Sequence, residues 1–331
     1  MRWKKIVITG GAGFLGSHLA SSLLTLGGEV VILDDFSNGK EIHLQKIINH
    51  PQLTVQRGDI TNSTDVQRAF ADAEVILHLA VLDLRASIKD PLRVNRVIVD
   101  GTLTCLEQAR KQPIQLFLNC SSSEVYGSAQ KIPMDETHPL HPETPYAAAK
   151  VAQDMYVRTY GETYGLPWNT VRPFNMYGPH SHWQGARGEL IPKMIVRAMN
   201  RQPLVIFGDG QQTRDFTYVQ DACDAIIKIL EQEKGRGEIV NICSGVETSV
   251  LQMARVICQY FKLDPELMIQ RQAARPADVR RHLGDPAKLK TLFHFTPTLS
   301  LEQGLPKTIE WFTSLPDPAR LLTQEVTRNW E

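Results

Sequence analysis

The stretch TGGAGFLGSHL, residues 9–19, decides the fold of this 331-residue chain. It places Gly10, Gly13 and Gly16 between a short apolar run and a segment of helical composition. In such a turn the first glycine permits a tight bend, the second lets the backbone approach a pyrophosphate, and the third lets the helix pack closely against the sheet. The N-terminus of the helix offers free N–H groups to phosphate oxygens. The pattern therefore predicts a dinucleotide-binding turn, with a purely structural glycine turn as the alternative.

Apolar runs of strand length alternate with segments of helical length over the first half of the chain. The runs are rich in Val, Ile and Leu without strict alternation, which is typical of strands buried on both faces of a parallel sheet. They are IVITG (6–10), EVVILDD (29–35), LTVQRGD (53–59), EVILHLA (74–80) and QLFLNCSS (115–122). The sequence therefore predicts an α/β fold with a Rossmann-type, doubly wound parallel sheet.

The composition of the sequence changes after residue 175, where Pro, Gly and His become frequent. Shorter elements follow, and we expect a smaller, mixed C-terminal substrate lobe over the carboxyl edge of the sheet. Its expected strands are LVIFGD, RDFTYV and EIVNICS, and its expected helices lie near 189–200, 220–233, 249–261, 286–292 and 301–314. The predicted division is a cofactor-binding domain over 1–175 with returns from the C-terminal half, a mainly substrate-binding lobe over 176–315, and a C-terminal extension over 316–331.

The charge balance and the cysteines restrict the class of protein. Lys and Arg total 36 residues and Asp and Glu total 36, which argues against nucleic acid or an anionic membrane as the main partner. The five cysteines form no C-x-x-C pair, which favours free thiols in a reducing compartment. No apolar run reaches the length of a membrane-spanning helix. We expect a cytoplasmic protein without a metal site, and we interpret His180 and His182 as loop residues.

The second predicted strand ends in two carboxylates, Asp34 and Asp35. A carboxylate at this point accepts hydrogen bonds from the ribose hydroxyls of a dinucleotide and repels the additional phosphate of NADP, so the sequence favours NAD. Asp34 is the expected ribose ligand, and Asp35 is the second choice because neighbouring strand residues face opposite sides. Asp59 and Ile60 follow the third strand and are expected beside the adenine, with a strand-to-helix cap as the alternative.

Two further motifs carry candidate catalytic groups. CSSSEVYG, residues 120–127, leaves a buried strand through three hydroxyls and a carboxylate, and YAAAK places Tyr146 and Lys150 on one face of a helix. A hydride leaves a carbon only if the proton of its hydroxyl is removed, and a phenol with a pKa of about 10 is a poor base at neutral pH. The Lys150 ammonium would lower the pKa of Tyr146, and Ser122 would hydrogen-bond the alcohol. We therefore predict a redox site, with a serine turn and a surface Tyr–Lys pair as the alternatives.

Together these motifs resemble the extended short-chain dehydrogenases/reductases that act on nucleotide sugars, the NAD-dependent epimerases and dehydratases. The resemblance also covers GDI, HLA, SSSEVYG, RPFNMYGP, IPK and GDGQQTRDFTYVQD, and it runs to about residue 312. It implies an enzyme with NAD as its cofactor, a UDP- or dTDP-sugar as its substrate, and Ser122, Tyr146 and Lys150 as its catalytic triad. The implied cofactor-binding residues are Gly10, Gly13, Phe14, Leu15, Gly16, Asp34, Asp35, Asp59, Ile60, Leu79, Ala80, Tyr146, Lys150 and Pro173.

The resemblance also implies where the substrate binds. Asn175 is expected at the diphosphate, and Arg214 and Arg275 are expected to clamp its oxygens, for which guanidinium groups are suited. The segment VLDLRAS departs from the family pattern and contains Asp83, Arg85 and Ser87. Arg85 beside Ser87 meets a polar sugar substituent or belongs to a surface loop, and the role of Asp83 stays open.

The members of this family share an oxidation of the sugar at C4 and diverge afterwards. Glu124 falls where the dehydratases hold a base for C5, and Ser123 falls where some of them hold an acid for the departing C6 hydroxyl. These residues favour a 4,6-dehydratase. The alternatives are a 4-epimerase of a UDP-hexose or UDP-uronic acid, a UDP-glucuronate decarboxylase, and a non-catalytic sensor of NAD or nucleotide sugars. A sensor would not need Ser122, Tyr146 and Lys150, the side chains that remove a proton.

The resemblance implies a homodimer as well. The helices at 101–111 and 147–164 are those that relatives pair into a four-helix interface. Their outward faces carry Leu, Met and Tyr, which would otherwise be exposed apolar surface.

Overall fold

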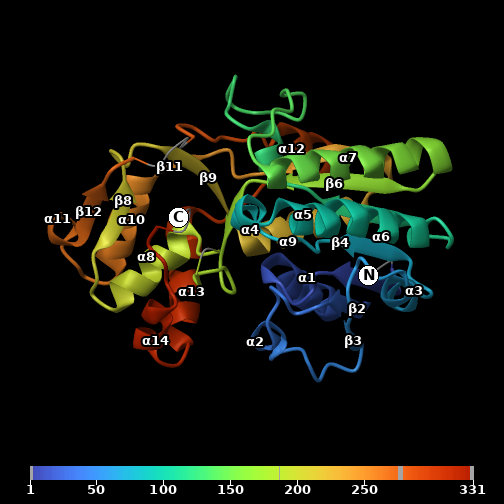
Figure 1. Ribbon diagram of the computed structural model, residues 1–331, viewed down its shortest axis with the longest axis horizontal. Coiled ribbons are helices and arrows are strands. Elements are labelled where there is room, and N and C mark those ends of the chain that lie inside the picture. The colour runs from blue at the N-terminus through green and yellow to red at the C-terminus, as the bar shows by residue number, and fades with distance from the viewer. Residues whose placement is uncertain (1–2, 186, 275–278, 329–331) are drawn as a thin grey trace.

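The computed structural model describes residues 3–185, 187–274 and 279–328, and its larger lobe is built on a seven-stranded sheet (Figure 1). The strand order is β10-β6-β5-β4-β1-β2-β3, and every neighbouring pair is parallel. The strands are β1 (Lys5–Thr9), β2 (Glu29–Asp34), β3 (Leu53–Arg57), β4 (Val75–His78), β5 (Leu116–Cys120), β6 (Trp168–Pro173) and β10 (Ile239–Ile242). The order reverses between β1 and β4, as in the doubly wound Rossmann-type sheet that the sequence predicts.

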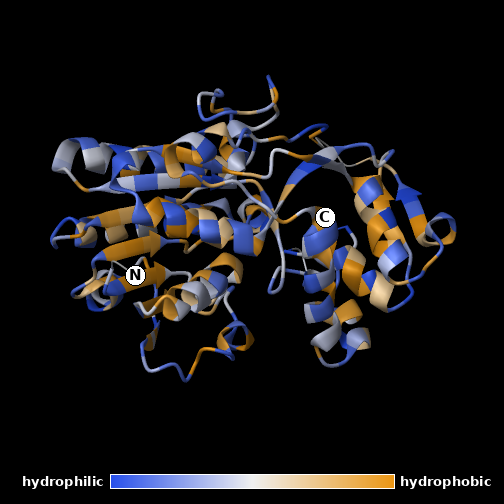
Figure 2. Cartoon of the chain, turned by 180° about the vertical axis from the view of Figure 1, so that it is seen from behind, coloured by the Kyte–Doolittle hydropathy of each residue, from blue (hydrophilic) through white to orange (hydrophobic). Residues whose placement is uncertain are grey.

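Helices cover both faces of this sheet because its strands are apolar on both sides. In β1, Ile6 and Ile8 belong to one hydrophobic core and Val7 belongs to another, and all three are fully buried. Figure 2 shows the hydrophobic residues concentrated along these strands. The covering helices include α1 (Phe14–Thr25), α3 (Ser63–Phe70), α6 (Gly101–Ala109), α7 (Pro145–Tyr164) and α9 (Val219–Glu231), and the π-helix η1 (Arg96–Asp100) leads into α6.

The smaller lobe contains two short sheets and lies beside the carboxyl edge of the main sheet (Figure 1). One sheet has the order β11-β9-β7, and the other pairs β12 with β8. Its strands are β7 (Asn175–Tyr177), β8 (Leu204–Phe207), β9 (Thr213–Tyr218), β11 (Glu247–Ser249) and β12 (Ile269–Gln272). Its helices are α8 (Leu190–Met199), α10 (Val250–Tyr260), α11 (Pro265–Met268), α13 (Leu301–Ser314) and α14 (Pro318–Thr323). The bounds predicted for the two domains stay a prediction.

Several short helices shape the loops between these elements. The short helices are α2 (Glu41–Leu44), α4 (Leu84–Lys89), α5 (Pro91–Asn95), η2 (Ser123–Tyr126), η3 (Glu233–Gly235) and α12 (Ala287–Phe293).

No helix within the described ranges is long and apolar enough to cross a membrane.

The sequence patterns do not predict β6, although it lies between β5 and β10. Its sequence WNTVRP lacks an apolar run, yet all six residues are buried. Arg172 is tolerated there because its Nε lies 3.0 Å from Asp154 Oδ2 of α7, and its Nη1 donates to the Tyr126 hydroxyl at 3.1 Å. That hydroxyl in turn donates to Asn241 Oδ1 of β10 at 2.7 Å. A buried guanidinium with these partners stabilises the strand that a hydrophobicity pattern cannot detect.

The Arg172–Asp154 pair should therefore be critical for stability. We expect Asp154→Ala to lower the free energy of unfolding by about 3 kcal/mol, because it leaves a buried guanidinium without its counter-ion. Glu162→Ala is the control, since Glu162 forms an exposed pair with Arg158 at 2.8 Å and should cost at most about 0.5 kcal/mol. Urea unfolding of both variants tests this, and equal losses would contradict it.

Candidate functional site

A cavity of about 610 Å³ lies over the carboxyl ends of the parallel strands. Every cofactor residue predicted from the sequence lines it, from the glycine turn through Asp34 and Asp59 to Lys150 and Pro173. The carboxyl edge of a doubly wound sheet, near the point where the strand order reverses, is where such folds bind ligands.

The glycine turn is packed so closely that side chains are excluded. Gly10 has a φ of +70°, and a Cβ there would lie 2.8 Å from the backbone nitrogen of Ala80. A Cβ on Gly16 would lie 2.4 Å from the carbonyl oxygen of Gly10. The first turn of α1 therefore stands directly at the cavity with its N–H groups available, which suits a pyrophosphate.

Asp34 supports the same turn from β2. Its Oδ2 accepts a hydrogen bond from Ala12 N at 2.9 Å, and its Oδ1 accepts one from Phe36 N at 2.8 Å. Burial is the main influence on this carboxyl and raises its pKa. Each oxygen keeps a second lone pair for a ribose hydroxyl. Asp35 is exposed, and its Oδ1 accepts from Ser37 N at 2.8 Å. The residues present thus fit a dinucleotide, with Asp34 as the better-placed ribose ligand.

The candidate triad meets at the other end of this cavity. Ser122 precedes η2 and lines this cavity together with Tyr146 and Lys150, and its hydroxyl oxygen accepts a hydrogen bond from Glu124 N at 3.2 Å. Lys150 is 2% exposed, and its Nζ donates to the carbonyl of Cys120 at 2.8 Å and to Gln153 Oε1 at 2.9 Å. The ammonium lies 6.0 Å from the centre of the Tyr146 ring. The structure thus brings together the three side chains that the motifs predict.

Burial controls the acidity of this set. It raises the pKa of the Tyr146 phenol, and the hydrogen bond with Ser122 acts in the opposite direction. Burial also lowers the pKa of the Lys150 ammonium. The expectation that Lys150 lowers the pKa of Tyr146 stays a prediction.

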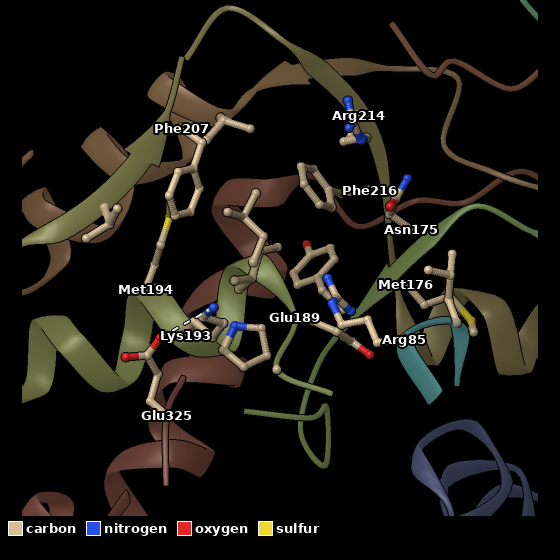
Figure 3. Close-up of a pocket in the computed structure, with 18 of the residues that line it drawn as sticks. Arg85, Asn175, Met176, Glu189, Lys193, Met194, Phe207, Arg214, Phe216 and Glu325 are labelled. Carbon is tan, nitrogen blue, oxygen red and sulfur yellow. Dashed lines mark ion pairs between the residues drawn. The ribbon is translucent and has the colours of Figure 1, made fainter. Parts of the chain in front are cut away.

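A second cavity of about 390 Å³ opens toward the smaller lobe (Figure 3). Asn175 and Arg214 line it, as expected for substrate-binding residues. Six residues line both cavities and so mark the point where a bound cofactor and a substrate would meet. They are Phe14, Leu84, Arg85, Glu124, Met176 and Glu189.

The junction of the two cavities holds two carboxyl groups and one guanidinium. Figure 3 shows Arg85 and Glu189 near each other in the substrate cavity. Burial raises the pKa of Glu124, which the positive charges of Arg214 and Arg85 partly offset. Burial raises the pKa of Glu189 to about 8, against the attraction of Arg85. Such perturbed carboxyl groups in a cleft are typical of sites that move protons.

Two predicted residues within the described part of the chain line neither cavity. Ser123 is one of them and is buried. Ser87 is buried and donates to the carbonyl of Leu84 at 2.6 Å. Their predicted catalytic and substrate-binding roles therefore have no support from the geometry. Arg275 lies outside the described residues.

The residues left open by the sequence have structural partners. The Asp83 carboxylate lies 3.1 Å from Arg187 Nε and caps α4 through the N–H of Ala86. His180 Nδ1 is within 2.8 Å of Ser17 Oγ, and its ring stacks on that of His43. Among the described residues no cluster of three potential ligands could hold a metal ion.

Sequence reasoning missed Glu189 and Glu325, which lies near the C-terminus. Glu189 directly precedes α8, next to the segment that resembles the family, so its position offered a signal. Glu325 lines the far end of the substrate cavity, 2.7 Å from Arg197 Nη1 and 3.4 Å from Lys193 Nζ. No local pattern connects that residue to α8, because more than a hundred positions separate them.

Comparisons with known proteins identify the family of this chain. The GDP-mannose 4,6-dehydratase family matches residues 7–308. A putative UDP-glucose 4-epimerase of Methanocaldococcus jannaschii is 33% identical over 92% of this chain and 97% of its own. A UDP-N-acetyl-alpha-D-glucosaminuronate decarboxylase of Bacillus cytotoxicus is 33% identical over 94% of this chain and 98% of its own.

A solved structure of a similar protein has the same fold as this chain. The dTDP-glucose 4,6-dehydratase of Streptomyces venezuelae, solved with NAD bound, superposes with a TM-score of 0.87 at 30% identity, covering 93% of this chain and 97% of that one. The chain belongs to the extended short-chain dehydrogenase/reductase family of NAD-dependent nucleotide-sugar epimerases and dehydratases.

The packing of the glycine turn generates a direct test of the cofactor site. We expect Gly16→Ala to weaken NAD binding by at least about ten-fold, because the added Cβ must displace the backbone that faces the phosphates. Gly27→Asn is the matched control, since Gly27 has a φ of +81° with nothing within 4 Å, a conformation that Asn tolerates. Calorimetric titration with NAD measures both, and unchanged affinity in Gly16→Ala would contradict the assignment.

Proposed function

We propose that this protein is an NAD-dependent nucleotide-sugar 4,6-dehydratase, acting on a UDP- or dTDP-sugar. The observation that carries the proposal is Glu124, a half-buried carboxyl with a raised pKa at the junction of the two cavities. A base for the sugar C5–H must reach a substrate held beside the nicotinamide, and Glu124 lines both spaces. A 4-epimerase is the second candidate, because a keto sugar could rotate in the same junction and take the hydride back on its other face without using Glu124.

The first step is oxidation of the sugar at C4. When bound, NAD supplies the acceptor for the hydride that leaves this carbon. Tyr146 takes the hydroxyl proton, and Ser122, which lines the same cavity, hydrogen-bonds the same oxygen as the carbonyl forms. The buried Lys150 ammonium favours the phenolate electrostatically.

Elimination of water follows in the proposed reaction. The C4 ketone acidifies the C5 proton, which Glu124 removes, and the C6 hydroxyl departs with a proton. The hydride taken from C4 would then return to C6 and a proton to C5, so that the oxidised cofactor is regenerated and the net change is the loss of one water. Ser123 is poorly placed to donate the proton to the departing C6 hydroxyl, because it is buried outside both cavities. Glu189 lies at the junction and, with a pKa raised to about 8, holds a proton at neutral pH. We therefore assign Glu189, rather than Ser123, as the proton donor.

Incubation with NAD and a panel of UDP- and dTDP-sugars, with products read by mass, tests the function. Loss of one water identifies a dehydratase, an unchanged mass with altered stereochemistry an epimerase, and loss of carbon dioxide a decarboxylase. A protein that binds these ligands and converts none of them is a sensor. We expect loss of water.

Substitution of Glu124 tests the assigned base. Glu124→Gln should slow water loss by at least about 100-fold, because removal of the C5 proton loses its general base. Exchange of the C5 proton with deuterated solvent should fall by the same factor. Glu143→Gln is the control, since Glu143 influences Glu124 electrostatically but lines neither cavity. Full turnover in Glu124→Gln would leave the 4-epimerase as the better assignment.

We also propose a homodimer that uses one apolar surface, formed by α4, α5 and α7. Leu92 and Ile88 are 81% and 55% exposed, and Tyr156 of α7 is 39% exposed. The helix predicted at 101–111 contributes less, because Cys105 and Leu106 of α6 face the core. Exposed apolar side chains on adjacent helices are typical of a helical interface.

Charge on this surface should separate the subunits. We expect Leu92→Glu to shift the protein from dimer to monomer in size-exclusion chromatography with light scattering, because the carboxylate would have to be buried. Leu267→Glu is the matched control: Leu267 is 79% exposed but belongs to α11 in the smaller lobe. A dimer that persists in Leu92→Glu, or a monomeric wild type, would rule out this interface.

We further propose a cytoplasmic location. All five cysteines are free thiols and four of them are buried, as expected for a chain kept in a reducing compartment.

A further inference from the structure

A continuous chain of buried hydrogen bonds connects the Lys150 ammonium to the glycine turn. Lys150 Nζ donates to Gln153 Oε1 at 2.9 Å, and Gln153 Nε2 donates to Thr102 Oγ1 at 2.9 Å. Thr102 Oγ1 lies 2.9 Å from His78 Nε2, and His78 Nδ1 lies 2.8 Å from Thr9 Oγ1. Gln153, Thr102, His78 and Thr9 are all fully buried. The chain crosses from α7 through α6 to β4 and β1.

The direction of each hydrogen bond in this chain is determined by its neighbours. Thr102 donates its only hydroxyl proton to the carbonyl of Ile98, so its oxygen can only accept from Gln153 and His78. His78 must therefore carry its proton on Nε2, which leaves Nδ1 to accept from the Thr9 hydroxyl. The Thr9 oxygen accepts from the N–H groups of Leu79 and Ala80, each at 3.2 Å.

The consequence is a single orientation for the Gln153 amide. Its NH2 group must face Thr102, so its oxygen must face Lys150. The Lys150 ammonium has three protons, and Cys120 and Gln153 accept two of them. The third is left for the ligand side of the site. Burial of His78 lowers its pKa to about 3, which keeps the neutral tautomer that the chain requires.

We propose that Gln153 is a positioning residue for Lys150. The Thr9–His78–Thr102–Gln153 chain fixes the position of the Lys150 ammonium relative to the glycine turn. Gln153 does not line either cavity, so it acts only through Lys150. The same chain ties the site to Ala80, whose backbone packs against Gly10.

Other groups around the lysine do not replace this contact. The titratable groups facing Lys150 are Cys120 at the end of β5, His78 on β4, and Asp154 and Tyr146 on α7. Asp154 is already paired with Arg172 at 3.0 Å, and Cys120 Sγ is directed at the carbonyl of Ser121. Tyr146 itself is faced by Ser122, Cys120, Glu124 and Asp83. Gln153 thus supplies the neutral side-chain acceptor that orients the ammonium, beside the backbone carbonyl of Cys120.

The test is Gln153→Leu in the NAD-bound protein. Loss of one acceptor disfavours the ammonium, so we expect the pKa of Lys150 to fall by about one unit. An NMR titration of labelled lysine, with the Lys150 signal assigned from a Lys150→Met spectrum, measures this without any substrate. On a nucleotide sugar that is turned over, kcat should fall about ten-fold while KM changes little, and the acid limb of the kcat–pH profile should move to higher pH.

Two further variants keep the inference falsifiable. Thr102→Val breaks the chain one link away and should move the same pH limb in the same direction by less; it also serves if Gln153→Leu does not fold. Gln220→Leu is the control, because Gln220 bridges Ser22 and Asp224 at the α1–α9 contact, far from Lys150 in the fold. It should move neither quantity.

An unchanged Lys150 titration and an unchanged pH profile in Gln153→Leu, whatever its thermal stability, would overturn the inference. The inference builds on the proposed redox role of Lys150, but the two fail separately. If no nucleotide sugar is converted, the proposed function is wrong, while the lysine titration still decides whether Gln153 positions Lys150.

Discussion

The close approach of the β1–α1 turn to the end of β4 is the constraint on which the rest of the structure depends. At Gly10 the backbone contacts the backbone of Ala80 at a distance that leaves no room for a Cβ. This contact brings the N-terminus of α1 to the carboxyl edge of the sheet, where its N–H groups face the larger cavity. Asp34 holds the same turn from β2 by accepting the N–H of Ala12. The position of a bound cofactor is therefore determined by backbone packing, before any side chain contacts it.

The catalytic groups are attached to this turn through buried polar contacts rather than through apolar packing. Lys150 bonds the last residue of β5, and the Gln153–Thr102–His78–Thr9 chain leads back to β1. Arg172, paired with Asp154, joins β6 to α7 in the same layer. Apolar contacts lack direction, whereas hydrogen bonds specify the orientation of each group. A site that must align a phenol, an ammonium and a hydroxyl benefits from that specification.

The meeting of the two cavities explains how one fold serves related reactions. Oxidation at C4 needs only the groups of the larger cavity, and those groups come from the motifs near Ser122 and Tyr146. In the proposed reaction, the next step depends on the carboxyl groups at the junction, Glu124 and Glu189, and on Arg85 of α4. Burial raises the pKa of both carboxyl groups, that of Glu189 to about 8. Small changes at this junction would redirect the same keto intermediate.

The sequence by itself determined the features that local patterns encode. The apolar runs predicted β1 to β5, since a strand buried on both faces must be apolar throughout. The glycine spacing, the acidic end of β2 and the Tyr146–Lys150 interval predicted the cofactor turn and the triad, because each depends on residues within one or two turns of each other. Tertiary structure alone decided the rest. Strand β6 lacks an apolar run and is stabilised by the pairing of Arg172 with Asp154, and Glu325 reaches the second cavity from a segment far from α8 in the sequence. Ser123 and Ser87, although adjacent to site residues, are turned into the protein. Which side chains converge depends on packing between elements far apart in the chain, and a local pattern carries no information about that.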